Sequence, residues 1–255
     1  MPNPDPRADP SVERRKKPRH KINSNFRLKA VLALNSGAEP GSEGTWKDWP
    51  ATLIDLSASG AHVQVNMAAV AFPEERCRLK LALGTFKLEI PGVVAHYICD
   101  TRAGACGVHF DFANEGVEKS FFRVLESVVV GVSLAPAANA ASDPAGRHHE
   151  LFTGKNFARL GVWRDAPGSP ITGIEFWMNR YVVEAYRASD AGPYVRPSMR
   201  ISGLTGDDSA DGAGGVPLSA AQTAEARWQF SLIVSNMTKA IPEDVHRFVL
   251  PLATG

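Results

Sequence analysis

The chain has 255 residues, enough for two modest domains or one large one. Apolar residues make up 44% and charged residues 22%, as in ordinary globular proteins, and the formal net charge is only +1. This balance excludes a protein that binds polyanions nonspecifically through its overall charge. The charge is uneven, however. Residues 7–21 carry seven Lys/Arg against two acids, which indicates a specific anionic partner.

The start of the chain predicts a protein without membrane insertion. No apolar run approaches the roughly 20 residues that a membrane helix needs, and the polar, Pro-rich start lacks the apolar core of a signal peptide. The three cysteines have no metal-ligand spacing. Cys99 and Cys106 flank a turn at 101–104, where they can face each other across a hairpin as reduced thiols. We therefore expect a cytoplasmic location, where thiols stay reduced.

Short strands dominate the part of the chain that follows a disordered arm predicted for residues 1–11. Residues 35–49 are Gly-rich and polar and are predicted to form a loop, and Gly84-Thr85 is predicted to be a tight turn. About six strands at short intervals favour an antiparallel barrel or sandwich. The predicted strands are 26–32, 61–65, 79–83, 86–90, 93–98 and 107–110.

After the strands, apolar residues at helical spacing predict an amphipathic helix over 117–130 that caps an open end of the barrel. An Ala/Pro/Ser-rich stretch then marks a linker at 131–150. These boundaries divide the chain into a mainly β domain at 12–130 and a smaller α+β region at 151–255.

The C-terminal region is less readable. Residues 173–178 and 181–186 fit two strands or one helix, and residues 203–215 form a Gly/Asp/Ser loop. A helix is predicted from Ser219, its N-cap, to Ala240, with Pro242 as the stop. No internal repeat is evident.

One candidate site element is the basic run around Arg15 and Arg19. Guanidinium groups bind phosphate through two hydrogen bonds and stack on purine rings. Pro18 keeps the segment out of a regular helix. On a flexible arm, the two arginines can therefore grip a ligand from different directions.

The second element is Asp55-Leu-Ser57-Ala-Ser-Gly60, where one predicted strand ends and another begins. Asp55 can accept hydrogen bonds from a guanine edge or brace an arginine. Ser57 supplies a hydroxyl, and Gly60 lets the backbone turn or approach a ligand closely. Each stretch also has an alternative without a ligand. The basic run can be a solvated tail, and the Asp55–Gly60 stretch can be a turn in which the side chains only cap the backbone.

Together, the two stretches resemble the two-part signature of the PilZ family, over residues 12–130. The resemblance implies a six-stranded antiparallel β-barrel with a C-terminal helix, and cyclic-di-GMP as the ligand. Arg15 and Arg19 would grip phosphate and stack on guanine, and Asp55, Ser57 and Gly60 would meet a guanine edge. Arg14 stands where the family favours an intercalated ligand dimer, which implies two ligand molecules per domain. His96 departs from the family, whose members often carry Trp there.

These observations predict a bacterial second-messenger receptor that couples nucleotide binding to a changed protein contact, in motility, exopolysaccharide or biofilm control. No set of catalytic residues stands out, so we expect no enzyme, no cofactor and no metal; His148-His149-Glu150 borders the linker and is a weak metal candidate. Three alternatives remain open. They are a nucleic-acid-binding module using the basic arm, a PilZ-fold adaptor that binds protein without ligand, and an enzyme in the C-terminal half gated by the first.

Overall fold

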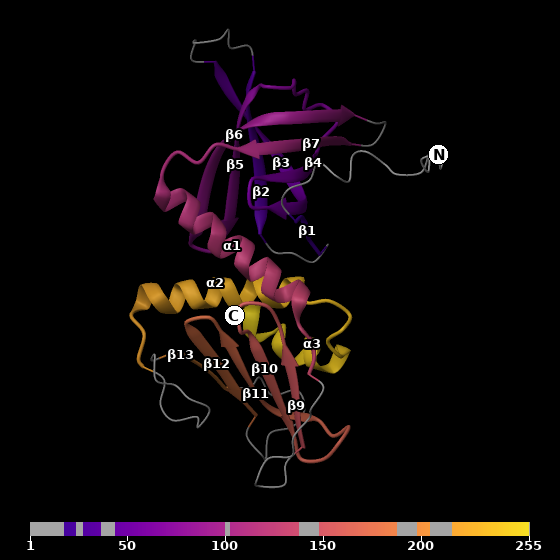
Figure 1. Ribbon diagram of the computed structural model, residues 1–255, viewed down its shortest axis with the longest axis vertical. Coiled ribbons are helices and arrows are strands. Elements are labelled where there is room, and N and C mark those ends of the chain that lie inside the picture. The colour runs from indigo at the N-terminus through magenta and orange to yellow at the C-terminus, as the bar shows by residue number, and fades with distance from the viewer. Residues whose placement is uncertain are drawn as a thin grey trace, which may run out of the picture.

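The computed structural model describes residues 18–23, 28–36, 44–99, 103–137, 148–187, 198–204 and 216–254. A β-barrel occupies one end of the molecule and an open sheet the other, with two helices between them (Figure 1). The predicted fold class, a mainly β first part followed by an α+β part, is confirmed. No helix among these residues is long and apolar enough to cross a membrane.

The barrel is closed and antiparallel. Its hydrogen-bonded order is β3-β2-β5-β6-β7-β4, and β4 pairs back with β3, so six strands form a ring without a free edge. The short β1 pairs with Asp55 and Leu56 of β3, beyond the stretch of β3 that pairs with β2. The strands are β1 (His20–Lys21), β2 (Lys29–Ser36), β3 (Thr45–Ser57), β4 (Gly60–Val65), β5 (Arg76–Leu83), β6 (Phe86–Cys99) and β7 (Gly104–Phe110).

Alternation along the strands builds the barrel core. In β2, Leu32 and Leu34 are fully buried, while Lys29 between the buried Leu28 and Ala30 is exposed. The loop predicted at 35–49 is wrong at both ends. Residue 35 belongs to β2, and β3 begins at Thr45, because β2 and β3 continue to pair through Ser36↔Thr45. Backbone pairing holds this end of β3, since four of its first five side chains are exposed.

The two strands predicted at 86–90 and 93–98 are one strand. Pro91 and Gly92 lie inside β6 and pair with Arg78 and Cys77 of β5. Proline is tolerated here because its carbonyl, and not an N–H, is used: Asp111 donates its backbone N–H to Pro91 O at 2.9 Å. The predicted turn at Gly84 is confirmed, with a left-handed φ of +58°.

The cysteine prediction is wrong in its geometry. Cys99 pairs across β6–β7 with Gly104, and Cys106 pairs with Tyr97. Cys106 is buried and Cys99 is exposed, so their side chains do not oppose each other. None of the three cysteines, all of which lie in the described ranges, forms a disulfide.

Helix α1 (Glu115–Ser133) closes one end of the barrel and contains the helix predicted at 117–130. Asn114 caps its N-terminus by accepting the backbone N–H of Val117 at 3.0 Å. Phe121 is fully buried and meets the ring of Phe110 edge-on at 4.8 Å. Truncating such a buried ring costs about 3–5 kcal/mol, so this contact is a main anchor of the helix on the barrel.

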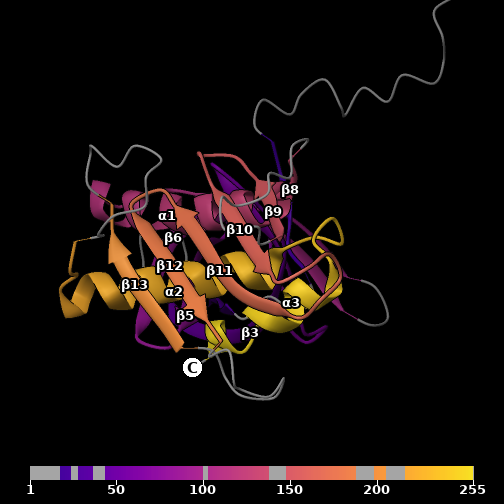
Figure 2. The same cartoon turned by 90° about the horizontal axis from the view of Figure 1, so that it is seen from below.

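The second part is a six-stranded antiparallel sheet in the order β13-β12-β11-β10-β9-β8. Figure 2 shows α2 and α3 on one face of this sheet. Of the two alternatives for 173–186, the two strands are correct; Asn179 makes the turn between them at a φ of 49°. The elements are β8 (Ala135–Pro136), β9 (His148–Thr153), β10 (Arg159–Arg164), β11 (Ile171–Met178), β12 (Tyr181–Tyr186), β13 (Ser198–Gly203), α2 (Ala220–Asn236), α3 (Glu243–Val249) and the short 3-10 helix η1 (Leu252–Thr254).

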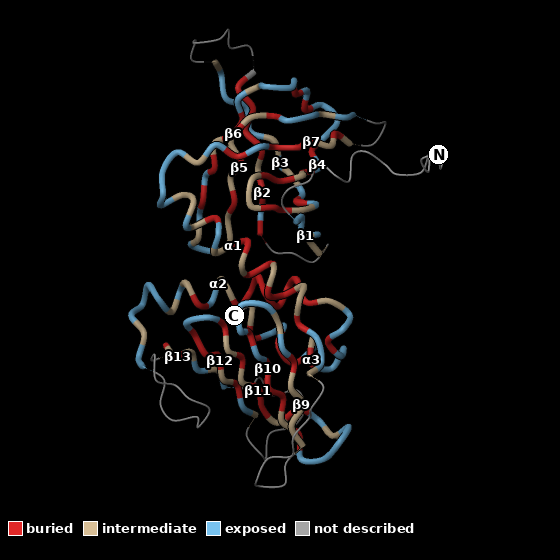
Figure 3. Tube along the Cα trace, viewed as in Figure 1, coloured by how far each residue is buried: buried red, intermediate tan, exposed pale blue. Residues whose placement is uncertain are grey.

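The predicted N-cap of α2 is confirmed, but its predicted end is not. Ser219 and Gln222 form a reciprocal capping box. The helix ends at Asn236, four residues before the predicted Ala240, and Pro242 instead begins α3. The helix ends because the C-cap Met237 leaves the helical conformation, with a ψ of 141°. Residues 230–237 are all buried where α2 meets α1 and the sheet (Figure 3).

Candidate functional site

A row of outward-facing positions crosses the barrel next to the Asp55 turn. Lys21 of β1 pairs with Asp55 of β3, Asp55 pairs with His62 of β4, and His62 pairs with Gly107 of β7. Gly107 in turn pairs with His96 of β6. We call these five residues the outer row.

Two β-bulges create the outer row. Leu53 and Leu56 both face the core, although they are three residues apart, because Ile54 is an extra residue between Leu53 and Asp55. The extra Ala95 acts in the same way between the buried Val94 and His96. Without these bulges, strict alternation would point Asp55 and His96 into the barrel.

Arg19 lies against the outer row. Its Nη1 donates to Asp55 Oδ1 at 3.1 Å, and the two side chains are 38% and 17% exposed. The pair uses one of the five N–H donors of the guanidinium, so a further acceptor can bind to the same side chain. The predicted association of the first motif with the second is thus present at Arg19 and Asp55.

The other predicted residues have different settings. Ser57 is buried and its Oγ donates to Gly60 O at 3.3 Å, so it closes the turn between β3 and β4. Gly60 is required by packing, because a Cβ there would lie 2.3 Å from Val108 O of β7. Arg14 and Arg15 lie outside the described residues.

The site also contains two histidines, which motif spacing did not predict as ligand residues. His62 Nδ1 lies 3.7 Å from Asp55 Oδ2, and the rings of His62 and His96 are 5.9 Å apart. Burial, then His62 and Arg19, lower the pKa of His96. The signal in the sequence was the broken alternation at 53–56 and 94–97, which marks both bulges.

Gly107 makes the outer row flat between the two histidines. A Cβ at this position would come within 2.1 Å of the His96 imidazole, so the ring lies directly over the glycine. The result is a shallow surface with two imidazoles, one guanidinium and one carboxylate. Such a surface can stack a planar group, bind phosphate and accept N–H donors.

The weak metal candidate is structural. His148 Nε2 lies 3.5 Å from Glu150 Oε1, and Glu150 also binds Arg164 at 2.7 Å, while the His149 ring stacks on Trp163 at 4.9 Å. Across the described part of the chain, no three metal-ligating side chains gather.

The fold and the site together define a closed antiparallel barrel with a cap helix and an arginine–aspartate pair on its outer face. Residues 13–127 match the family model described as PilZ domain, so this part of the chain is a PilZ domain. The resemblance seen in the sequence is confirmed over nearly the predicted range.

Two solved structures show distant similarity to this chain. The chain is similar to K. pneumonia MrkH in its complex with c-di-GMP, at 14% identity and a TM-score of 0.35, over 46% of this chain and 52% of that one. It thus spans about half the length of MrkH. It is also similar to Borreliella burgdorferi PlzA in complex with c-di-GMP, at 11% identity and a TM-score of 0.23, over 89% and 96%. No curated protein matches the chain.

Proposed function

We propose that this protein is a cyclic-di-GMP receptor whose ligand binds on the outer row. The observation that carries the proposal is the Arg19–Asp55 pair beside His62 and His96, on a PilZ barrel. Cyclic-di-GMP combines two phosphates with two flat guanines. The site has the matching groups: cations for phosphate, rings for stacking and a carboxylate for the guanine edge.

In this proposal, Arg14, Arg15 and Arg19 lie on the segment of residues 12–23, here called the arm, and close over the ligand. Arg19 exchanges part of its contact with Asp55 for phosphate, and Asp55 then accepts from guanine. Ordering the arm costs conformational entropy, which the phosphate contacts offset. Arg14 next to Arg15 favours two intercalated ligand molecules per domain. Ser57 and Gly60 shape the turn that carries Asp55.

The segment that contains Arg19 also contacts the second half of the molecule. Four residues after Arg19, the backbone N–H of Asn23 donates to Asn236 Oδ1 at 2.9 Å. Asn236 is 1% exposed at the end of α2, and its Nδ2 donates to Val128 O of α1 at 3.2 Å. One side chain therefore joins the arm, α1 and α2. Repositioning the arm by ligand would act on the packing of α1 against α2.

A ligand shifts such an equilibrium only as far as its affinity differs between the two states. In our proposal, the C-terminal half is an interaction module whose partner contact changes with the arm. The receptor acts in the cytoplasm, in motility, exopolysaccharide or biofilm control, as is usual for the family. It acts without catalysis and without a metal.

Isothermal titration of the full chain with cyclic-di-GMP tests the proposal. We expect binding at micromolar concentrations with a stoichiometry near two, and a loss of at least about tenfold in affinity for Arg19→Ala or Asp55→Ala. Arg15→Ala should lose a similar amount. Lys119→Ala is the matched control, because it removes an exposed cation of α1 that pairs with Glu115 within its own helix.

Absence of heat at tens of micromolar ligand would overturn the proposed receptor function. Equal affinities of Arg19→Ala and Lys119→Ala for cyclic-di-GMP would also overturn it. A stoichiometry near one would overturn only the role of Arg14. Binding to random duplex DNA with steep salt dependence would instead favour the nucleic-acid alternative.

A further inference from the structure

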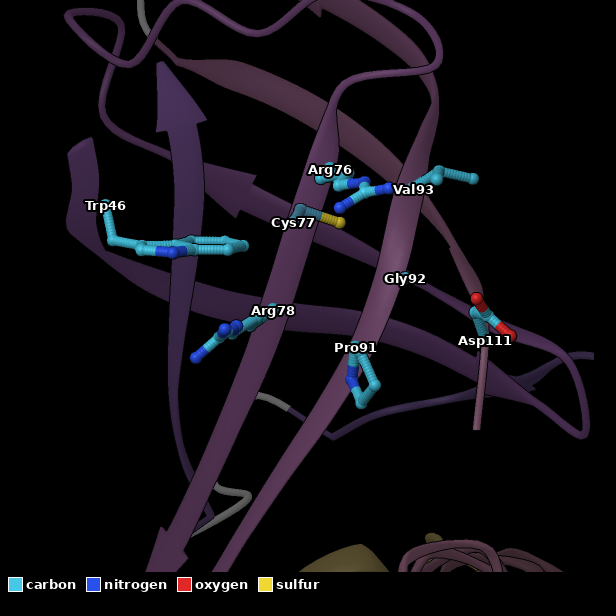
Figure 4. Close-up of a pocket in the computed structure, with 8 residues that line it drawn as sticks. All are labelled: Trp46, Arg76, Cys77, Arg78, Pro91, Gly92, Val93 and Asp111. Atoms are coloured by element: carbon cyan, nitrogen blue, oxygen red, sulfur yellow. The ribbon is translucent and has the colours of Figure 1, made fainter. Parts of the chain in front are cut away.

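A hollow of about 340 Å³ lies on the barrel flank between β3, β5 and β6, and none of its lining residues belongs to the outer row. Trp46, Arg76, Arg78 and Asp111 provide its aromatic and charged groups, and Pro91 and Cys77 lie between them (Figure 4). We call it the flank pocket.

The flank pocket has a preorganised cationic wall. The Arg78 guanidinium lies over the Trp46 ring at 4.1 Å, and its Nη1 donates to Glu89 Oε1 at 2.9 Å. These two contacts hold the guanidinium flat and leave further N–H donors on it. Arg76 is exposed and forms no ion pair with any residue in the described ranges. In Figure 4, its side chain extends toward Val93 on the neighbouring strand.

A second, independent feature lies beside this wall. Asn35 is only 8% exposed, and its Oδ1 has no hydrogen-bond partner among the described part of the protein. Asn35 pairs with Trp46 across β2–β3, and the preceding Leu34 faces the core, so Asn35 lies on the Trp46 side of the sheet. A buried acceptor without a donor is uncommon in proteins, but Asn35 does not line the flank pocket, so the ligand site consists of the lining residues alone.

The pocket has the groups for binding and not for covalent chemistry. Cys77 is the thiol that borders it, but this residue is 1% exposed, and burial raises the pKa of its thiol to about 12. A thiol that stays protonated is a poor nucleophile. The pocket can therefore recognise a ligand by charge, stacking and hydrogen bonding.

We propose that the flank pocket binds a purine nucleoside monophosphate. Arg76 and Arg78 hold the phosphate, the exposed part of Trp46 packs on the base, and N–H donors of the ligand reach Asp111. The carboxylate of Asp111 disfavours a ligand with a second anionic group at that end. This proposal is independent of the receptor function proposed for the outer row.

Titration of the full chain with 5′-GMP, inorganic phosphate and guanosine, each measured by calorimetry, tests the assignment. We expect GMP to bind at least about tenfold more tightly than phosphate or guanosine, because it engages both the cations and Trp46. Arg76→Ala and Trp46→Leu should each lose about tenfold in GMP affinity. Cyclic-di-GMP affinity should stay within about twofold of wild type in Arg76→Ala, since additive effects are expected at separate sites.

Lys80→Ala is the matched control. Lys80 is also on β5 and carries the same charge, but it pairs with Asp48 at 2.8 Å and does not line the pocket. Equal losses for Lys80→Ala and Arg76→Ala would reduce the effect to general electrostatics and overturn the proposal. The proposal would also be overturned if GMP bound no more tightly than phosphate. The same holds if GMP binding were lost in Arg19→Ala and kept in Arg76→Ala. Binding of an acidic peptide in place of GMP would also overturn it, in favour of a protein contact.

Discussion

The two halves of the molecule each hold a paired arginine, in opposite ways. Arg19 of the barrel is 38% exposed and meets one carboxylate, Asp55, at 3.1 Å. Arg164 of the second sheet is 5% exposed and meets Glu150 at 2.7 Å, Asp244 at 2.6 Å and the carbonyl of Ser169 at 2.7 Å. An exposed pair is worth little to stability and can exchange its partner, whereas a buried one is costly to break. The barrel arginine is suited to a ligand and the sheet arginine to the fold.

The largest expected effect comes from breaking the sheet arginine. Arg164→Met should lower the free energy of unfolding by about 2–4 kcal/mol, because Glu150 and Asp244 lose their shared cation. The estimate lies below that for a fully enclosed pair, since the Asp244 side chain is 50% exposed. Urea unfolding followed by circular dichroism measures the change.

Arg200→Met is the control in the same sheet. Arg200 is 66% exposed and pairs with Glu184 at 2.8 Å. Its removal should cost less than about 1 kcal/mol. Similar losses for both variants would remove the contrast between buried and exposed arginines.

The contact between the halves comes next. Asn236→Ala leaves the Asn23 N–H and the Val128 carbonyl without the partner they have now, which should cost about 1–3 kcal/mol. Ser235→Ala is the matched control, because the buried Ser235 hydroxyl donates back to Ser231 O within its own helix. Urea unfolding compares the two. An equal effect of both substitutions would mean that Asn236 does not join the arm to the helices.

A smaller effect is expected from pH at the outer row. Burial, and then His62 and Arg19, lower the pKa of His96, so the folded protein disfavours its protonated form. The unfolded chain thus binds more protons below the ordinary value of 6.5, and the contribution of His96 to stability falls as the pH falls through that value. An anionic ligand opposes this shift, so His96 takes up a proton when the ligand binds.

Affinity for cyclic-di-GMP should therefore rise as the pH falls from 8 to 6, by less than about tenfold, the limit set by a shift of one pKa unit. Calorimetry in two buffers of different ionisation enthalpy reports the proton uptake. His96→Gln should abolish most of the dependence on pH. A pH dependence unchanged in this variant would assign the proton to another group.

The sequence predicted the barrel well, because its strands bury alternate residues and its motifs mark the ends of β3 and the start of β4. None of the six predicted strands lies within β3 (Thr45–Ser57), and the predicted number was reached by counting β6 as two strands. At the start of β3, Trp46, Lys47 and Asp48 are all exposed, and only pairing with β2 makes a strand. Long-range pairing of this kind leaves no periodic signal.

The site was predicted in part for a related reason. Motif spacing identified Arg19 and Asp55, which the fold brings together. His62 and His96 are 34 positions apart, and only the register of β4, β7 and β6 places them in one row. Alternation tells which side a residue faces, but each bulge shifts the register, so the row follows from tertiary structure.

The smallest effect tests Glu175, a partly buried carboxylate of the second sheet. Glu175 and Glu184 lie directly opposite each other on β11 and β12, and burial, with Glu184, raises the pKa of Glu175. A raised pKa in the folded state means that stability contributed by the protonated form is lost as the pH rises through that pKa. At pH 7, Glu175→Gln should therefore raise the free energy of unfolding, by less than about 1 kcal/mol for a half-exposed group.

Glu184→Gln is the control. Because Arg200 already neutralises Glu184, this substitution should not stabilise the protein. Glu175 also accepts the indole N–H of Trp177 at 2.7 Å, a contact that an amide oxygen keeps in weaker form. If Glu175→Gln lowers stability in urea unfolding, the charged hydrogen bond outweighs the repulsion between the two glutamates. Glu175 would then resemble Arg164, as a partly buried charge that its hydrogen bonds keep in the fold.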